Sequence, residues 1–161
     1  MPISATGNNR RGITLMELMV VLAIIVLVVG ISFPNTMAGL ANIRLASATG
    51  SIAAFLNAGM NHAERRQQPV ELTVSIPENS LAMRSPEPGY FKKLDLPQGI
   101  SVKAVWPALA EESDEPRRFL FMPGGVPPRI GIEIADRRGS RRIVRVDPIT
   151  GVPQIERPEA E

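Results

Sequence analysis

A single carboxylate, Glu17, stands inside a long apolar run near the start of the chain. The run covers residues 13–33 and is otherwise interrupted only by Thr14 and Ser32. A charge surrounded by lipid is costly, and such a group usually has a function. Glu17 could snorkel to the membrane surface within its own subunit, or it could pair with a cation. One available cation is the α-amino group that a cut just before Ile13 would create.

The length and flanks of this run predict a transmembrane helix. Residues 13–33 would span about 31 Å as a helix at about 1.5 Å per residue, which matches a hydrocarbon core of about 30 Å. Arg10 and Arg11 precede the run, so the N-terminal side should stay in the cytoplasm while the C-terminal body is translocated. A cleaved secretory signal is the alternative, but its apolar region is usually shorter and ends in small residues. Residues 31–34 make a poor site of that kind, so retention in the membrane is favoured.

The densest basic group lies near the C-terminus, at Arg137, Arg138, Arg141, Arg142 and Arg145. It could bind the phosphates of a nucleic acid, or it could be the charged tip of a hairpin that stays in solvent. Aromatic residues that would stack on bases are missing from the nearby sequence. Without Arg10 and Arg11, the remaining 16 basic side chains face 16 acidic ones. This balance argues against a general nucleic-acid surface, so a solvated hairpin or a partner contact is favoured.

Other residue types that carry chemistry are scarce. The chain has no cysteine, which excludes a disulfide framework and a thiolate metal site. Its single histidine, His62, is expected to be a surface or packing residue. The acidic stretch 111–115 lacks the spacing of a calcium-binding loop and should be a solvated loop. No phosphate-binding loop and no nucleophile paired with a base can be recognised, so the sequence predicts no metal, no cofactor and no enzymatic activity.

The rest of the chain predicts one helix followed by short strands. Apolar and small residues recur at helical spacing from residue 34 to about Arg66, and no charge occurs between Arg44 and Glu64. This helix should therefore bury one face against a sheet. Alternating or apolar stretches between Pro and Gly residues predict strands at 70–76, 81–84, 100–106, 119–122, 130–134 and 142–146. A long N-terminal transmembrane helix packed on an antiparallel β-sheet gives an α+β fold.

Residues 10–18, Arg-Arg-Gly-Ile-Thr-Leu-Met-Glu-Leu, resemble the type III signal sequence of type IV pilins and type II secretion pseudopilins. In that family a short basic leader ends in glycine, a membrane peptidase cuts after the glycine, and the new N-terminal residue is methylated. The resemblance implies that prepilin peptidase cuts between Gly12 and Ile13 and that Ile13 is N-methylated. It also implies a role in assembly for Glu17, and it places Pro34 where pilin helices often kink.

A second resemblance covers the C-terminal half. Residues 119–125 look like the F-x-P-D-G segment of the GspH/FimT pseudopilin family, with Gly124 at the position of the aspartate. The strands predicted at 130–134 and 142–146 and a Thr-Gly turn at 149–152 follow in the same order as in that family. The resemblance implies a pilin-like fold and a minor pseudopilin of the H type, without a cofactor, near the tip of a type II secretion pseudopilus. Such a subunit supports export of folded proteins across the outer membrane.

The implied partners are prepilin peptidase, other minor pseudopilins, the major pseudopilin, the inner-membrane assembly platform and the inner membrane itself. The alternative is a FimT-like minor type IV pilin that binds DNA for uptake or assists pilus assembly.

The expected organisation has four parts. A leader at 1–12 is cleaved, a transmembrane helix occupies 13–33, a helix at 34–66 continues into the globular domain, and a β-rich periplasmic domain covers 67–161. The protein would then cross the inner membrane once, with its N-terminus in the cytoplasm and its C-terminal domain in the periplasm, before it joins a periplasmic filament.

Processing of the leader gives the first testable prediction. Mass spectrometry of protein extracted from membranes should show a chain that begins at methylated Ile13, because the leader ends in Arg-Arg-Gly and an apolar run follows. A bulky residue in place of Gly12 should block the cut, since the peptidase must accept that residue beside the scissile bond. An intact leader in cells with active prepilin peptidase would contradict the prediction.

Overall fold

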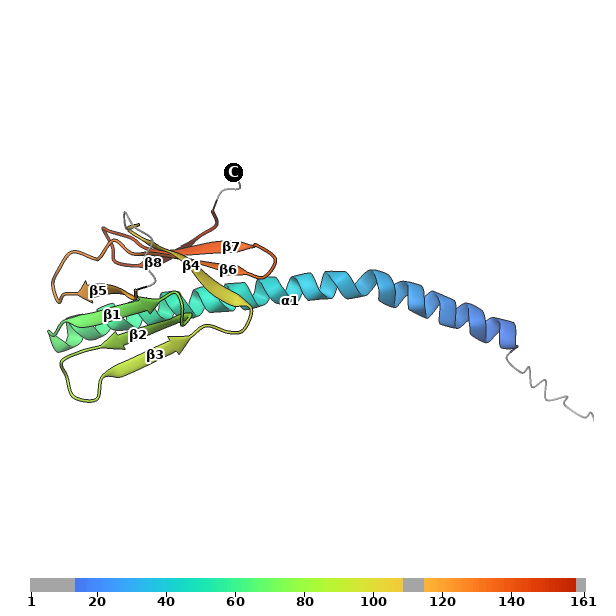
Figure 1. Cartoon of the computed structure of the whole chain (residues 1–161), viewed down its shortest axis with the longest axis horizontal. Coiled ribbons are helices and arrows are strands. Elements are labelled where there is room, and N and C mark those ends of the chain that lie inside the picture. Colours follow the sequence, from blue (N-terminus) through green and yellow to red (C-terminus); the bar gives the residue numbers. More distant parts are fainter. Residues whose placement is uncertain (1–13, 109–114, 159–161) are drawn as a thin grey trace, which may run out of the picture. The chain divides into compact units, whose positions relative to one another are not determined.

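The structure is a computed structural model that describes residues 14–108 and 115–158, and for residues 31–40 it describes the backbone alone. The predicted leader and most of the acidic stretch 111–115 therefore lie outside the described residues. The chain divides into two compact units, Met1–Gly39 and Leu40–Glu161. The helix α1 (Leu15–Arg66) contributes to both units, and the strands all belong to the second (Figure 1).

In the first unit, α1 exposes its apolar side chains. The large apolar residues from Leu15 to Val29 are between 50% and 78% exposed. Among the described residues, no helix combines the length and the apolar character needed to cross a membrane. The span predicted at 13–33 extends beyond those residues at both ends, because Ile13 and the side chains of 31–33 are outside them. The transmembrane helix therefore stays a prediction.

The helix that the sequence predicts at 34–66 is confirmed as the second part of α1, which continues through Pro34. Proline has no N–H to donate, so one intrahelical hydrogen bond is missing there. The helix ends at Arg66 through a Schellman turn, in which Gln67 adopts a φ of 53° and the Gln68 N–H donates to the Ala63 carbonyl over 3.3 Å.

Two four-stranded antiparallel sheets make up the rest of the second unit, where the sequence predicts a single sheet. The first sheet has the order β3 (Phe91–Asp95), β2 (Ser80–Arg84), β1 (Val70–Ser75), β5 (Arg117–Phe121). The second has the order β4 (Ile100–Trp106), β6 (Gly131–Asp136), β7 (Arg141–Val146), β8 (Pro153–Glu156).

The six predicted strands are all present, and no end differs from the prediction by more than two residues. The hairpins β1–β2 and β6–β7 pair in the predicted way. The strands β3 and β8 have no counterpart in the sequence prediction. Both lie at sheet edges and bury little, so they lack the alternation that reveals the others.

Asn79, in the β1–β2 turn, connects the two sheets. Its φ of 53° places it in the left-handed region, which asparagine tolerates better than most residues. The side-chain Nδ2 donates to the Ile100 carbonyl over 2.6 Å, and Oδ1 accepts from the Val102 N–H over 2.8 Å. One amide thereby satisfies two backbone groups at the edge of β4, just before the irregular register between Val102 and Ala104.

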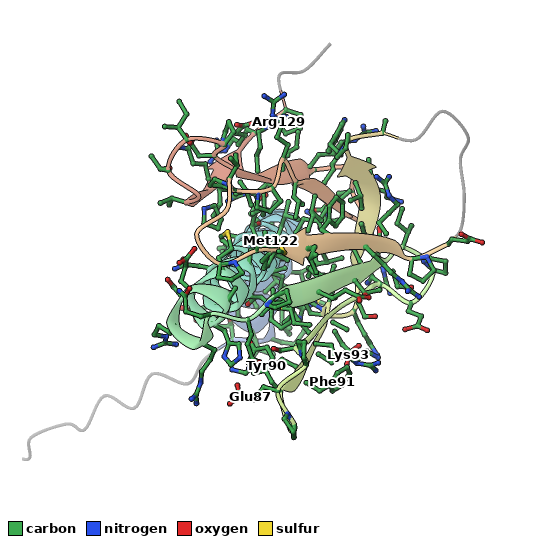
Figure 2. The ribbon with its side chains drawn as sticks, turned by 90° about the vertical axis from the view of Figure 1, so that its left-hand side faces the viewer. Glu87, Tyr90, Phe91, Lys93, Met122 and Arg129 are labelled. Atoms are coloured by element: carbon green, nitrogen blue, oxygen red, sulfur yellow. The ribbon has the colours of Figure 1, made fainter. Side chains whose placement is uncertain are left out.

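Both sheets share one hydrophobic core with α1. The helix contributes Leu45, Ala48, Ile52, Leu56 and Ala63, each no more than 2% exposed. Figures 1 and 2 show the sheets on different sides of this part of the helix. The first sheet adds residues such as Leu72 and Phe121, and the second adds Ile132 and Val144. The helical face predicted to be buried is therefore confirmed.

Two glycines of α1 provide a matched test of this packing. A Cβ at Gly59 would lie 2.5 Å from Met83 Sδ and 2.9 Å from Phe121 Cε2, whereas nothing lies within 4 Å of a Cβ at Gly50. We expect Gly59→Leu to lower the free energy of unfolding by about 1–3 kcal/mol through overpacking. Gly50→Leu should raise it by about 0.5–1 kcal/mol, because leucine favours a helix more than glycine does. Urea unfolding of the full chain in detergent measures both, and equal changes would contradict the assigned helix face.

Candidate functional site

Thr14 caps the N-terminus of α1. Its Oγ1 accepts a hydrogen bond from the Glu17 N–H over 3.2 Å, and the first helical bond runs from the Leu18 N–H to the Thr14 carbonyl over 3.1 Å. The pattern Thr-x-x-Glu is that of a capping box, in which a glutamate at the third helical position lies near unsatisfied backbone N–H groups. Glu17 is the acidic residue of the first turn, where the helix dipole favours a negative charge.

This cap is a feature that the sequence interpretation of Glu17 did not include. The family resemblance implies a role in assembly for Glu17, and the structure shows in addition that its backbone N–H is part of the cap of its own helix. Gly12 and Ile13, the predicted processing residues, lie outside the described residues. Because Ile13 immediately precedes the capping residue Thr14, a cut after Gly12 would place the new α-amino group one residue before the cap.

The five arginines of the basic cluster do not form one surface. Arg137 and Arg138 are exposed in the turn between β6 and β7. Asp136 Oδ1 closes that turn by accepting from the N–H groups of Arg138 and Ser140, each over 2.9 Å. The other three lie on β7, where alternate residues face opposite sides of a sheet. Arg142 therefore faces away from Arg141 and Arg145.

Arg141 and Arg145 are each engaged by a carboxylate. Arg141 Nη1 lies 3.3 Å from Glu133 Oε1, and Arg145 Nε lies 3.3 Å from Glu156 Oε2. The glutamates belong to the flanking strands β6 and β8. These pairs neutralise much of the positive charge that the sequence displays on β7. The interpretation as a solvated hairpin tip suits Arg137 and Arg138, while nucleic-acid binding by the cluster stays an untested prediction.

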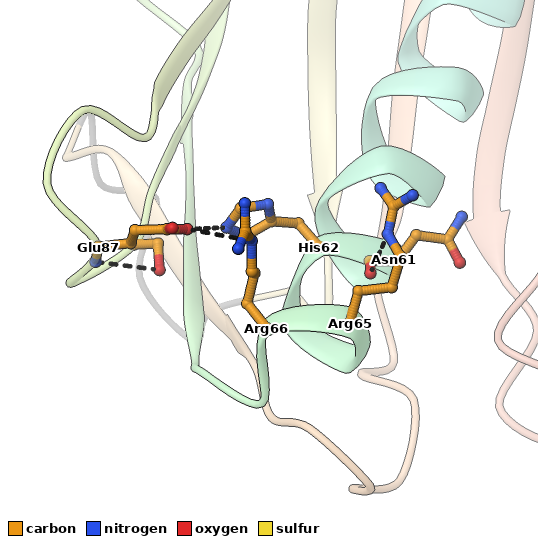
Figure 3. A network of polar contacts seen from close by, with 6 residues as sticks. Asn61, His62, Arg65, Arg66 and Glu87 are labelled. Atoms are coloured by element: carbon orange, nitrogen blue, oxygen red, sulfur yellow. Dashed lines mark hydrogen bonds and ion pairs between the residues drawn. The ribbon is translucent and has the colours of Figure 1, made fainter.

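His62 packs in a small cluster at the C-terminal end of α1. Its ring stacks on Tyr90, with centroids 3.6 Å apart and planes inclined by 15°. His62 Nε2 lies 3.2 Å and Arg66 Nε 3.6 Å from Glu87 Oε2 (Figure 3). Burial raises the pKa of Tyr90, and the charge of Arg65 offsets part of that rise. The expectation of a packing role for His62 is confirmed, because the cluster holds the β2–β3 connection against the helix.

The segment 122–125 is tied to the helix by a residue that the sequence analysis did not single out. Glu64 Oε1 accepts from the Gly124 N–H over 2.8 Å. Gly124 has a φ of 63°, which favours glycine at this position. A pocket of about 290 Å³ lies beside this contact, between the helix residues 57–64 and the loops at 122–128 and 150–152.

The Thr-Gly turn of the C-terminal half depends on Asp147. Its Oδ1 accepts from the N–H groups of Ile149 and Thr150 over 2.8 and 2.9 Å, and Gly151 adopts a φ of 71°. The hydrogen bonds from Thr150 and Ile149 hold the pKa of the Asp147 carboxyl below its usual value. An Asp-Pro-x-Thr-Gly pattern signals such a turn in sequence. In the described ranges, no group of three or more histidine or acidic residues could hold a metal ion.

Comparison with known proteins gives two findings. The prokaryotic N-terminal methylation motif matches residues 7–33. The minor pseudopilin EpsH from the Type 2 Secretion System of Vibrio cholerae has a similar fold, with a TM-score of 0.55 and 11% sequence identity over 73% of this chain and 99% of the EpsH chain. No curated protein sequence matches the chain. The chain thus combines a prepilin-type methylation motif with a pilin-like α+β fold.

Proposed function

We propose that this chain is a minor pseudopilin, a structural subunit near the tip of a type II secretion pseudopilus that supports export of folded proteins across the outer membrane. The observation that carries the proposal is the methylation motif at residues 7–33 on a chain with the fold of a minor pseudopilin. Prepilin peptidase would cut between Gly12 and Ile13, and Ile13 would then be N-methylated. The role is structural, with neither a catalytic group nor a cofactor.

In this proposal residues 13–33 anchor the subunit in the inner membrane until it joins the filament. The N-terminal side stays in the cytoplasm, and the unit Leu40–Glu161 lies in the periplasm. The exposed apolar side chains from Leu15 to Val29 support this arrangement, because such a surface is stable only against lipid or against other apolar helices. The partners are other minor pseudopilins, the major pseudopilin and the inner-membrane assembly platform.

Assembly would depend on a charge pair between Glu17 and the α-ammonium of Ile13 on a neighbouring subunit. Cleavage creates that cation at the edge of an apolar environment, where an unpaired charge is costly. Glu17 is the one ionisable side chain in the run 13–33. The pair forms only at one axial offset between two helices, so it would also set their register.

Glu17 has a competing role in its own subunit, where it lies in the first turn beside the Thr14 cap. A carboxylate at this position stabilises a helix N-terminus by about 0.3–1 kcal/mol. The two roles make different demands. The pair with another subunit needs the charge of Glu17, whereas the cap needs the Thr14 hydroxyl.

Two substitutions separate these roles and test the proposed function. Glu17→Gln keeps the shape of the side chain and removes its charge. We expect the variant to be cleaved and to reach the membrane, but to co-purify with partner pseudopilins at about one tenth of the wild-type yield, since breaking a desolvated pair leaves one charge uncompensated. Thr14→Ala is the control, because it removes the cap and keeps the charge, and it should assemble nearly as well as the wild type.

Glu17→Gln protein that assembles and supports secretion like the wild type would contradict the charge pair. An equal loss in both variants would assign Glu17 to the cap. Mass spectrometry of each variant checks that processing at Gly12 is complete.

The alternative function, DNA capture by a FimT-like minor pilin, has less support. It would need a continuous basic surface, whereas Arg142 faces away from Arg141 and Arg145, and the latter two are paired with Glu133 and Glu156.

A further inference from the structure

The outer face of the second sheet carries a hollow between Trp106 and Arg145. In the register of the sheet, Trp106 pairs with Gly131 and Gly131 pairs with Arg145. Directly paired residues project to the same face of a sheet, and Gly131 has no side chain. Across these three strands, a gap therefore lies above Gly131, between the indole of Trp106 and the guanidinium group of Arg145. Its volume is about 370 Å³, and its other lining residues are Pro107, Arg129, Ile130, Val146 and Pro148.

Glycine at position 131 is what keeps this hollow open. A Cβ there would lie 3.2 Å from Trp106 Cε3 and 3.4 Å from Trp106 Cβ, so any other residue would displace the indole or fill the space beside it. The Gly131 backbone is buried, while Trp106 remains partly exposed. The hollow thus has an apolar aromatic wall that a ligand can reach from solvent.

The charges at the hollow favour an anionic occupant. Arg145 forms an ion pair with Glu156, in which Nε lies 3.3 Å from Oε2. Arg129, at the rim, forms no hydrogen bond or ion pair with any residue in the described ranges. Figure 2 shows Arg129 on the side of the domain that carries the second sheet, far from Tyr90 and Glu87 on the opposite side. Among the residues that the structure describes, no carboxylate therefore pairs with this cation beside the apolar hollow.

We propose that this hollow binds an acidic segment of a partner protein, which places one large apolar side chain against Trp106 and a neighbouring carboxylate on Arg129. Tryptophan and arginine are the residue types that most often dominate protein interfaces. The prolines at the rim lose little conformational entropy when a partner binds. An arginine also suits a carboxylate, because its planar N–H groups can donate two parallel hydrogen bonds.

A nucleic acid suits the same face less well, although an indole can stack on a base. Its phosphates would follow the strand direction and would approach the carboxylates of Glu133 and Glu156, which lie on this face beside Arg141 and Arg145. A peptide with one carboxylate beside its apolar side chain needs a single cation on the protein, and Arg129 supplies that cation.

The proposal rests on the unit Leu40–Glu161 alone, so it is independent of the N-terminal motif and of the proposed secretion role.

Trp106 provides the measurement, because it is the single tryptophan of the chain. The full chain in detergent is titrated with an acetylated, amidated tripeptide of glutamate, phenylalanine and glutamate, and the fluorescence of Trp106 is recorded. We expect a saturable change with this peptide. We expect none with a peptide in which lysines replace the glutamates, and none with one in which glycine replaces the phenylalanine.

Two variants test whether the positive charge of Arg129 is the one that binds the acidic peptide. Arg129→Gln should weaken binding of the acidic peptide about fivefold. Arg138→Gln removes the same charge from the exposed β6–β7 turn and should leave binding unchanged. Equal loss in both variants, equal binding of the lysine peptide, or no fluorescence change with the acidic peptide would overturn the proposal. An oligothymidylate that binds more tightly than the peptide and competes with it would also overturn it, and would assign the face to nucleic acid.

Discussion

The burial of one face of α1 between Leu45 and Ala63 is the interaction on which the rest of the domain depends. Both sheets bury their inner residues in a core that contains this face. The helix approaches the first sheet closely at Gly59, where a side chain would collide with Met83 and Phe121. Beyond the core, the Asn79 amide joins the sheets at the edge of β4. The helix is therefore the central element of an α+β domain.

The same helix has an opposite character in its first part. There the large apolar side chains from Leu15 to Val29 are exposed. None of the described strands belongs to that unit. Burying apolar surface is the dominant favourable term in folding and association, so this segment needs a lipid or protein environment. The prokaryotic N-terminal methylation motif covers the same part of the chain, residues 7–33. The Thr14 cap and Glu17 mark where that surface begins.

Much of this fold follows from sequence, and the exceptions have physical causes. The alternation of Val70, Leu72 and Val74 predicts β1, since one face of that strand is buried completely. The edge strand β3 escapes prediction because Phe91, Lys92 and Lys93 are all exposed, and lysines on an edge also discourage pairing with another chain. The alternation of apolar and polar residues does not reveal which sheet a strand joins. The sequence therefore predicts one sheet where the structure has two. The ion pairs of Arg141 and Arg145 link neighbouring strands. They cannot be predicted from the sequence of the basic cluster, because their glutamate partners lie outside it.

Cross-linking from the exposed part of α1 tests most directly whether this surface is an assembly surface. The chain has no cysteine, so Met16→Cys, at a position 77% exposed, gives a single thiol for a benzophenone maleimide label in native membranes. Illumination should yield adducts with other N-methylated subunits, identified by mass spectrometry, and these should disappear when prepilin peptidase is inactivated. Labelled protein that cross-links to lipid alone, or forms the same protein adducts without the peptidase, would contradict a role for this helix in assembly.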